Sequence, residues 1–412
     1  MRGFTVFPSN WEVKPLATIA KKFIDGDWIE SKDQSHTGIR LIQTRNIGQG
    51  KFNDQTDKFR FIDDTTFERL NCSEIFPGNI LISRLPDPVG RACIVPHKSQ
   101  RMITAVDCSV VELDGNVIEN KFFIYYAQTD AYFRDVEAEC TGTTRKRISR
   151  RNLGGIKIPI PSQEEQKRIV TILDQAFAAL DRARALAEVN LADAFTVFHA
   201  SVETLLSTHK ETWIRGTFEQ LVGQVFTGPF GSLLHKNDYV QGGTPLVNPS
   251  NIVDGRIVPD ASKTVSDAVL KRLYAYQLQS GDIVMGRRGE MGRCAAVPPA
   301  MEGWLCGTGS FVIRPKEGVS AELVGYLLRR PDMIERLTGI ATGTTMLNLN
   351  NRALAEMDFE LPAPALQRNL LNSIKGLEEA SRRLTDVYAQ KLSEIDALQK
   401  AVLRQAFSGQ LS

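Results

Sequence analysis

The sequence TGTTRKRISRRNL at residues 141–153 occurs again as TGTTMLNLNNRAL at residues 342–354, 201 residues later and without a gap. The opening Thr-Gly-Thr-Thr is identical in both places, whereas the next three residues change from Arg-Lys-Arg to Met-Leu-Asn. A phrase repeated so far along one chain indicates an internal duplication, and such a duplication decides the fold before any local pattern does.

Five further pairs of segments occur in the same order in both halves of the chain. They are WEVKPLATIA (11–20) and WIRGTFEQLV (213–222), LIQTRNIGQGKF (41–52) and LVNPSNIVDGRI (246–257), PGNILISR (77–84) and SGDIVMGR (280–287), VGRACIVP (89–96) and MGRCAAVP (291–298), and IPIP (158–161) and LPAP (361–364). Their separation stays between 201 and 205 residues. The chain therefore consists of two copies of one unit.

Each unit has two parts of different character. Residues 1–160 and 210–362 are rich in glycine, proline and β-branched residues with short apolar runs between turns, which predicts mixed α/β domains. Residues 161–209 and 363–412 predict long helices, which the prolines at their starts allow to begin there. We therefore expect an α+β fold in which two mixed domains are separated by two long helices that form an antiparallel coiled coil, with an internal pseudo-two-fold repeat.

The predicted helices carry apolar residues at steps of four and three, the spacing of a helix seam. The seam positions are Ile169, Leu173, Ala176, Leu180, Ala183, Ala187 and Leu191, and then Leu370, Ile374, Leu377, Ser381, Leu384, Tyr388 and Leu392. Both series end on an extra step of four, which locally unwinds a coiled coil. Each helix of roughly 40 residues is about 60 Å long, so the pair can act as a spacer; the alternative is that each helix folds back on its own domain.

Composition limits the class of protein. With 412 residues, a net charge of +2, 42% hydrophobic and 24% charged residues, the chain falls in the globular range, and any basic surface must be local. The chain has neither a signal-peptide core nor an apolar run of about eighteen residues, so we expect a cytoplasmic protein. The six cysteines have no zinc-finger spacing, which predicts free buried thiols in a reducing compartment.

Motifs for catalysis are missing from the sequence. The strings NPSN at residue 248 and VPPA at residue 297 are not the NPPY tetrapeptide that holds a flipped adenine, and no Walker phosphate loop occurs. The five histidines lie far apart and predict neither a metal site nor a catalytic triad. Any chemistry associated with this chain is therefore expected to come from partners.

The pattern resembles the specificity (S) subunit of type I restriction-modification systems over essentially the whole chain. The resemblance rests on the duplication and on GDIVMGRRGEMGR (281–293), IPIPSQEEQKRIVTILD (158–174) and LRQAFSGQLS (403–412). It implies two target recognition domains on double-stranded DNA, separated by two conserved helical spacers. It also implies a non-catalytic chain without its own cofactor, which holds two methyltransferase (M) subunits and, in the full complex, restriction (R) subunits; S-adenosylmethionine, Mg²⁺ and ATP are then expected on those partners.

One segment departs from this pattern. The second helix starts with LPAPALQRNLL (361–371), in which Gln-Arg-Asn stands where the first helix has Glu-Glu-Gln. This difference leaves open whether both helices hold their methyltransferases equally.

Two basic clusters are the candidate DNA contacts, because arginine can bind phosphates and chelate a guanine edge. The candidates are Arg145, Lys146, Arg147 and Arg150, with Arg151 beside them, after the first repeated phrase, Arg287, Arg288 and Arg293 in the second copy, Arg84 and Arg91 as the counterparts of Arg287 and Arg293, and Thr143, Thr144, Thr344, Thr345 and Asn348 in the phrase itself. The alternatives are a solvated loop for the clusters and a strand-end salt bridge for Arg84 and Arg91. For Asn46 and Asn251 we expect turn chemistry rather than adenine recognition.

The divergence after the shared Thr-Gly-Thr-Thr predicts two different half-sites, and therefore an asymmetric bipartite target with half-sites roughly 10 base pairs apart. Three other functions remain open: a specificity partner of a methyltransferase-nuclease fusion, a coiled-coil scaffold that does not bind DNA, and a fused restriction enzyme, which would need catalytic motifs that are not seen.

Overall fold

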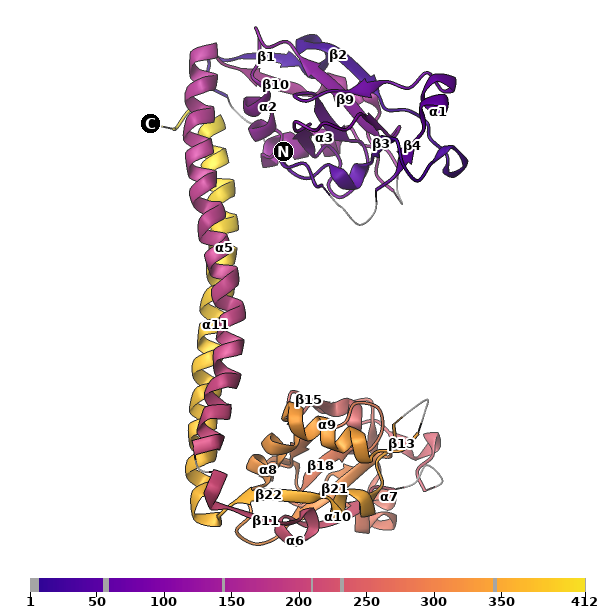
Figure 1. Ribbon diagram of the computed structural model, residues 1–412, viewed down its shortest axis with the longest axis vertical. Coiled ribbons are helices and arrows are strands. Elements are labelled where there is room, and N and C mark those ends of the chain that lie inside the picture. The colour runs from indigo at the N-terminus through magenta and orange to yellow at the C-terminus, as the bar shows by residue number, and fades with distance from the viewer. Residues whose placement is uncertain are drawn as a thin grey trace. The chain divides into compact units, whose positions relative to one another are not determined.

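The computed structural model describes residues 7–54, 59–142, 145–208, 210–229, 233–343 and 347–411. The chain forms two compact units, residues 1–191 with 387–412 and residues 192–386. Each unit contains one mixed α/β domain and one part of each of the two long helices (Figure 1). The two units are described in turn.

The first domain is built on two four-stranded sheets. The first sheet is antiparallel, with the strand order β2 (Ala20–Asp25), β9 (Cys108–Leu113), β6 (Ile80–Ser83) and β7 (Ala92–Ile94). The second is mixed, with the order β4 (Phe61–Ile62), β3 (Ile39–Ile42), β8 (Met102–Thr104) and β5 (Glu74–Ile75). A separate antiparallel pair joins β1 (Glu12–Pro15) to β10 (Lys157–Ile160). Every residue of β3 and of β6 is buried, as expected for strands in the middle of a domain.

Short helices cover these sheets. They are η1 (Leu16–Ile19), η2 (Ser31–Asp33), η3 (Thr44–Asn46), α1 (Asp64–Arg69), α2 (Asn120–Tyr126), α3 (Asp130–Ala138) and α4 (Arg150–Gly155). The core between α2, α3 and the sheet is aromatic, with Phe122, Phe123, Tyr126 and Tyr132 fully buried. Their rings meet at centroid distances of 5.8 Å for Tyr126–Tyr132 and 6.4 Å for Phe123–Tyr132, in edge-to-face geometry.

The second domain repeats this architecture. Its sheets run β12 (Gly223–Thr227), β21 (Ser310–Pro315), β18 (Ile283–Gly286), β19 (Cys294–Ala296), and β13 (Tyr239–Val240), β17 (Thr264–Val265), β14 (Thr244–Val247), β20 (Leu305–Cys306), with the pairs β11 (Trp213–Thr217)–β22 (Asp358–Pro362) and β15 (Ile252–Val253)–β16 (Arg256–Ile257). Its helices are η4 (Lys210–Thr212), α6 (Phe218–Leu221), η5 (Lys236–Asp238), η6 (Pro249–Asn251), α7 (Asp267–Arg272), η7 (Tyr274–Tyr276), η8 (Pro299–Met301), α8 (Ala321–Leu328), α9 (Pro331–Ile340) and α10 (Asn351–Glu356). The first sheet has the same strand order by position in the copy, which confirms the duplication.

The two long helices are α5 (Gln163–Thr208) and α11 (Pro364–Phe407), of 46 and 44 residues. In the first unit the start of α5 shares one core with the end of α11, through Ile169, Leu403 and Phe407. In the second unit the end of α5 shares a core with the start of α11, through Val202 and Ile374. In both units the N-terminal end of one long helix packs against the C-terminal end of the other, so the helices are antiparallel. The predicted α+β fold with a helix pair is confirmed, and the alternative that each helix serves only its own domain is wrong.

The seam of the helix pair differs in detail from the prediction. Its buried members are Ile169, Leu173, Ala187, Leu370 and Ile374, and its partly buried members are Ala176, Leu180, Leu191, Leu377, Ser381, Tyr388 and Leu392. Leu384 is 46% exposed. One turn before Leu384 the two helices approach each other through short side chains, and the Ser381 hydroxyl donates to the Ala194 carbonyl oxygen at 3.1 Å. Two helices alone do not cover a leucine side chain at this position, so Leu384 stays exposed. On α5 the predicted seam residue Ala183 is exposed, and the half-buried residue after Leu180 is Arg184, which binds Asp396. The steps from Leu180 through Arg184 and Ala187 to Leu191 are therefore four, three and four, so the predicted extra step is absent from α5.

A buried glutamine fixes the start of each long helix to its domain. Gln166 accepts a hydrogen bond from the Glu119 backbone N–H (2.8 Å) and donates to the carbonyl oxygens of Val117 (2.9 Å) and Pro161 (3.0 Å). Gln367 accepts from the Ser320 backbone N–H (2.8 Å) and donates to the Pro362 carbonyl oxygen (2.8 Å).

These contacts correct the predicted register of the helix starts. Gln367 is the counterpart of Gln166, so IPIP corresponds to FELP at residues 359–362 rather than to LPAP. The glutamine of Glu-Glu-Gln is therefore retained in the second copy, and only the two glutamates are replaced, by Ala365 and Leu366.

All six cysteines are free, and five of them are buried, as the spacing predicted. Burial raises the pKa of Cys93 to about 12 and that of Cys294 to about 11. Among the described residues no helix is both long and apolar enough to span a membrane.

Candidate nucleic-acid interface

The repeated phrase forms the same small loop in both domains, here called the repeat loop (residues 141–149 and 342–350). In the first copy Thr141 and Arg147 exchange two backbone hydrogen bonds of 2.8 and 2.9 Å; in the second, Thr342 and Asn348 do so at 3.0 and 2.8 Å. The glycine of the phrase has φ of +94° in the first copy, and a Cβ atom at Gly142 would lie 2.6 Å from the Arg145 carbonyl oxygen. The phrase therefore requires glycine to close the loop.

Each repeat loop is attached to the end of a central strand. The backbone N–H of Ile148 donates to the Arg84 carbonyl oxygen (3.2 Å), and that of Leu349 donates to the Arg287 carbonyl oxygen (2.9 Å). The next residues, Ser149 and Asn350, cap α4 and α10 with their side chains. The described residues of the phrase thus hold the loop against the strand and start the next helix. Four predicted contacts in it, Thr143, Thr144, Thr344 and Thr345, lie outside the described residues.

Two of the predicted DNA contacts are buried in the first domain. Arg84 is 5% exposed; its Nη1 lies 3.3 Å from Asp25 Oδ1 and its Nη2 donates to the Val106 carbonyl oxygen at 2.6 Å. Arg91 is 8% exposed and donates to four backbone carbonyl oxygens, those of Thr44, Ile47, Leu85 and Pro88, at 2.6 to 3.0 Å. Burial lowers the pKa of Arg91. Because these guanidinium groups already bind within the domain, we leave both out of the candidate interface; the ion-pair alternative describes Arg84.

The basic cluster of the first repeat loop is exposed and partly neutralised. Lys146 binds Glu137 and lowers its pKa. Arg147 Nη2 lies 3.1 Å from Asp107 Oδ1, and Arg150 Nε lies 3.9 Å from Asp25 Oδ2. Within the part of the chain that the structure describes, Arg145 and Arg151 have no hydrogen-bond or ion-pair partner for their side chains. Arg145 in the loop and Arg151 at the start of α4 are therefore exposed cations that no described residue neutralises.

The second domain differs in its charges. Arg293 binds Glu290, with Nε 3.1 Å from Oε2. Arg287 Nε donates to Asn348 Oδ1 at 3.3 Å, and its guanidinium lies 5.9 Å from the centroid of the Phe311 ring. Burial lowers the pKa of Arg287, and the charge of Arg288 lowers it further. Arg288 is exposed, and no carboxylate among the described residues pairs with Arg287 or Arg288.

Asp25 and Asp107 were missed by the sequence analysis, although they set the charge of the first interface. The signal was present in the repeat: Asp107 accepts the backbone N–H of Arg84 at 2.9 Å, and its counterpart Gly309 accepts that of Arg287 at 3.0 Å. An aspartate in the first copy therefore corresponds to a glycine in the second copy.

Asn46 and Asn251 serve their turns, as predicted. Asn46 Oδ1 accepts from the Gln43 N–H (2.9 Å) and its Nδ2 donates to the Asn53 carbonyl oxygen (3.0 Å). Asn251 makes the same two contacts at 3.0 and 3.1 Å. Both are buried and unavailable to a base.

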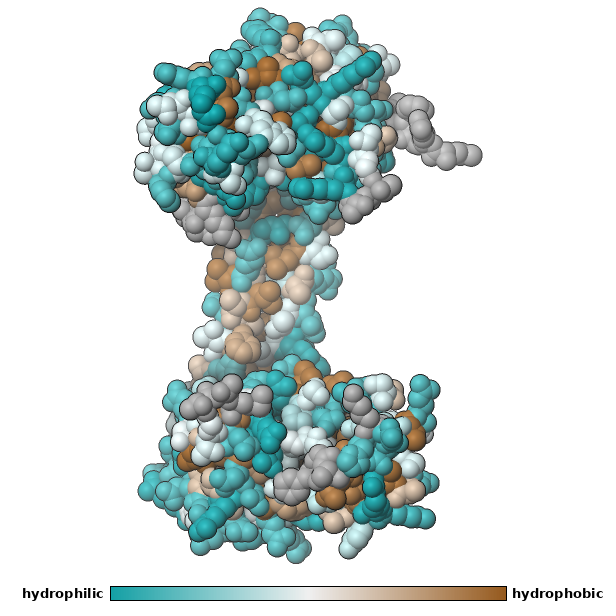
Figure 2. All heavy atoms as spheres, turned by 90° about the vertical axis from the view of Figure 1, so that its right-hand side faces the viewer, coloured by the Kyte–Doolittle hydropathy of each residue, from teal (hydrophilic) through white to brown (hydrophobic). Residues whose placement is uncertain are grey.

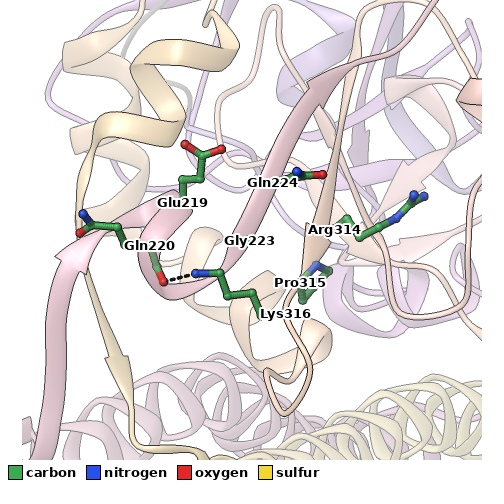
Figure 3. Close-up of a pocket in the computed structure, with 7 residues that line it drawn as sticks. All are labelled: Glu219, Gln220, Gly223, Gln224, Arg314, Pro315 and Lys316. Atoms are coloured by element: carbon green, nitrogen blue, oxygen red, sulfur yellow. Dashed lines mark hydrogen bonds between the residues drawn. The ribbon is translucent and has the colours of Figure 1, made fainter.

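A shallow pocket of about 480 Å³ lies beside β12 and β21 in the second domain. Figure 3 shows Lys316 pointing toward Gln220, to whose carbonyl oxygen it donates at 2.6 Å, and Arg314 pointing away from both. Arg314 is bound to the buried Asp282 by two bonds of 2.8 Å. Arg314 is therefore neutralised within the domain, and no cluster of three or more metal-ligating side chains occurs among the described residues.

Fold and loops together define a class of protein: two copies of one α/β domain, each with arginines in or beside its repeat loop, attached to an antiparallel helix pair. The family described as the type I restriction modification DNA specificity domain matches residues 8–191 and 222–394. The chain belongs to this family.

Individual relatives agree with this assignment. The putative type I restriction enzyme MjaX specificity subunit of Methanocaldococcus jannaschii is 22% identical over 171 residues, which span 40% of this chain and 39% of the relative. The fold is similar to that of the HsdS subunit from Thermoanaerobacter tengcongensis, with a TM-score of 0.61, 16% identity and 99% of each chain covered. A chain from a structural study of complex assembly and conformational transition of the type I R-M system has a TM-score of 0.76 at 16% identity, with 98% of this chain and 100% of that chain covered.

Proposed function

We propose that this chain is the DNA sequence-specificity subunit of a type I restriction-modification complex, which reads a bipartite target with one half-site for each domain. The observation that carries the proposal is the repeat loop: one scaffold is built twice, and the side chains that it presents differ. The first copy exposes Arg145, Lys146 and Arg147, and the second carries Leu347 and Asn348 at the corresponding end of the loop. Loops of one geometry with different side chains suit two different half-sites, so the target is asymmetric.

Partners supply the chemistry in this proposal. The family is in general non-catalytic, and the sequence carries neither an adenine-binding tetrapeptide nor a phosphate loop. Methyltransferase subunits bring S-adenosylmethionine and flip the target adenines, and restriction subunits bring Mg²⁺ and ATP.

The long helices offer a surface for such partners. In the first unit Leu186 is 65% and Val189 is 56% exposed; in the second unit Phe195 is 66% exposed. Figure 2 shows hydrophobic side chains at the surface of the helix pair. Exposed apolar side chains on neighbouring turns are typical of protein interfaces, and we assign them to methyltransferase docking.

Methylome sequencing tests the proposed function. DNA from a host that expresses this chain with its neighbouring methyltransferase is compared with DNA from a host that lacks the chain. We expect N6-methyladenine on both strands of an asymmetric motif with an unread gap. A palindromic motif would contradict the asymmetry. Absence of chain-dependent methylation would favour a scaffold that does not bind DNA. A methyltransferase that carries its own nuclease domain would identify the system as the fusion type.

A further inference from the structure

The two domains can be compared residue by residue along one row of the first sheet. In the first domain Asp25 pairs with Ser109, and Ser109 with Ile82. In the second domain Thr227 pairs with Phe311, and Phe311 with Met285. Arg84 and Arg287 each follow two residues after the last member of the row. Thr227 therefore stands where the first domain has Asp25.

Asp25 is the centre of a polar cluster in the first domain. Its carboxylate lies 3.3 Å from Arg84 Nη1 and 3.9 Å from Arg150 Nε, and the Ser109 hydroxyl donates to it at 3.4 Å. Asp107, just before β9, pairs with Arg147 of the repeat loop. Three arginines are thus balanced by two carboxylates of the same domain.

None of these acids exists in the second domain. Thr227 replaces Asp25, Gly309 replaces Asp107, and Phe311 replaces Ser109. Arg287 keeps the position of Arg84, but among the described residues its guanidinium binds the neutral amide oxygen of Asn348, at 3.3 Å, and no carboxylate; it also lies over the face of Phe311. Arg288 follows it directly.

Partial burial of one guanidinium group beside a second one costs free energy unless an anion or a set of oxygen acceptors binds the buried group. Within the described residues this chain supplies no such acceptor with a negative charge. On the proposed function, on which this inference rests, the missing group belongs to DNA.

We propose that Arg287 and Arg288 form an acceptor-binding site for DNA that is peculiar to the second domain, whereas the first domain neutralises the corresponding Arg84 internally. The ligand chemistry is a pair of oxygen or nitrogen acceptors, which a backbone phosphate and the O6/N7 edge of guanine both offer to an arginine. The first domain makes its own contacts through Arg145 and Arg151.

The test restores the acid of the first domain. Thr227→Asp places a carboxylate at the position of Asp25, where it can pair with Arg287; Thr227→Asn is the matched neutral control of similar size. Arg288→Gln is the second variant, because Arg288 is exposed and its removal leaves the core untouched. Each variant is assembled with the methyltransferase, its melting temperature is measured, and binding to the parental target is titrated at several salt concentrations.

We expect Thr227→Asp and Arg288→Gln each to weaken binding by about tenfold or more, and Thr227→Asn to match the parent. The methylome of each variant gives its motif: an unchanged motif with a smaller salt dependence identifies a phosphate as the ligand, and a motif relaxed at one guanine identifies the base edge. If Thr227→Asp does not fold, Arg288→Gln alone decides.

If folded Thr227→Asp and Arg288→Gln both bound the target with the affinity of the parent chain, the inference would be wrong, while the proposed function would stand. If the parental complex showed no specific DNA binding at all, the proposed function would fail, and the inference with it.

Discussion

Removing the buried glutamine at the start of a long helix is expected to destabilise its unit strongly. Gln166→Ala strands the backbone N–H of Glu119 and the carbonyl oxygens of Val117 and Pro161, and Gln367→Ala strands two groups, the Ser320 N–H and the Pro362 carbonyl oxygen. A buried polar group without a partner costs roughly 1–3 kcal/mol, and the carbonyl oxygens less than the N–H because they keep a second lone pair for other donors. We therefore expect losses of about 3 kcal/mol for Gln166→Ala and about 2 kcal/mol for Gln367→Ala.

Two measurements check this expectation. Calorimetric unfolding should show a larger loss for Gln166→Ala than for Gln367→Ala, with Lys167→Ala as the control, because Lys167 is an exposed neighbour on the same turn. Hydrogen exchange should show faster exchange of the Glu119 N–H in Gln166→Ala only. Unfolding of Gln166→Ala at the temperature of the Lys167→Ala control, with the Glu119 amide still protected, would refute the reasoning.

Four further outcomes are expected. Deletion of four residues from the middle of α5 removes about 6 Å of helix and should shorten the unread gap or abolish binding; an unchanged gap in the methylome would rule out a spacer role. With a net charge of +2, the isolated chain should bind its target weakly and with strong salt dependence, and fluorescence anisotropy with and without the methyltransferase measures the difference. One thiol per native chain should react readily with a disulfide reagent, because only Cys140 is not buried; several fast thiols would contradict the buried environments. Hydrogen bonds from Lys98 and Arg40 hold the pKa of Asp54 below 3.8, so the stabilisation is present above that pH and is lost as the pH falls through the lower native value; Asp54→Asn should flatten this part of the acid unfolding curve.

The sequence was sufficient for the architecture because duplication and helix spacing are regular signals. Two copies of one unit and a pair of long helices follow from repeated phrases and from steps of four and three. The register of the helix start was missed by two residues, because IPIP matches LPAP in composition while the position of the buried glutamine fixes FELP as its counterpart. Leu384 looked like a seam residue, but burial depends on what the facing helix offers.

The candidate interface was predicted less well, because charge depends on partners that are distant in sequence. Arg84 and Arg287 look equivalent in the repeat, yet Asp25 lies 59 residues before Arg84 and is replaced by Thr227 in the second copy. Arg91 appeared to be a basic residue for DNA, and its four carbonyl partners come from two separate loops. Neither the loss of the Arg84 partner in the second copy nor the internal hydrogen bonds of Arg91 can be predicted from the spacing of residues along the chain.

The glutamine contacts have a consequence for how such a protein can evolve. Gln166 and Gln367 bind only main-chain atoms of their domains. This part of the attachment therefore does not depend on which side chains the domain carries at those positions, whereas the apolar core shared with the helix does. Substitutions at the surface of a domain, away from the residues that pack on its helix, can therefore accumulate while the main-chain contacts of the glutamine stay the same.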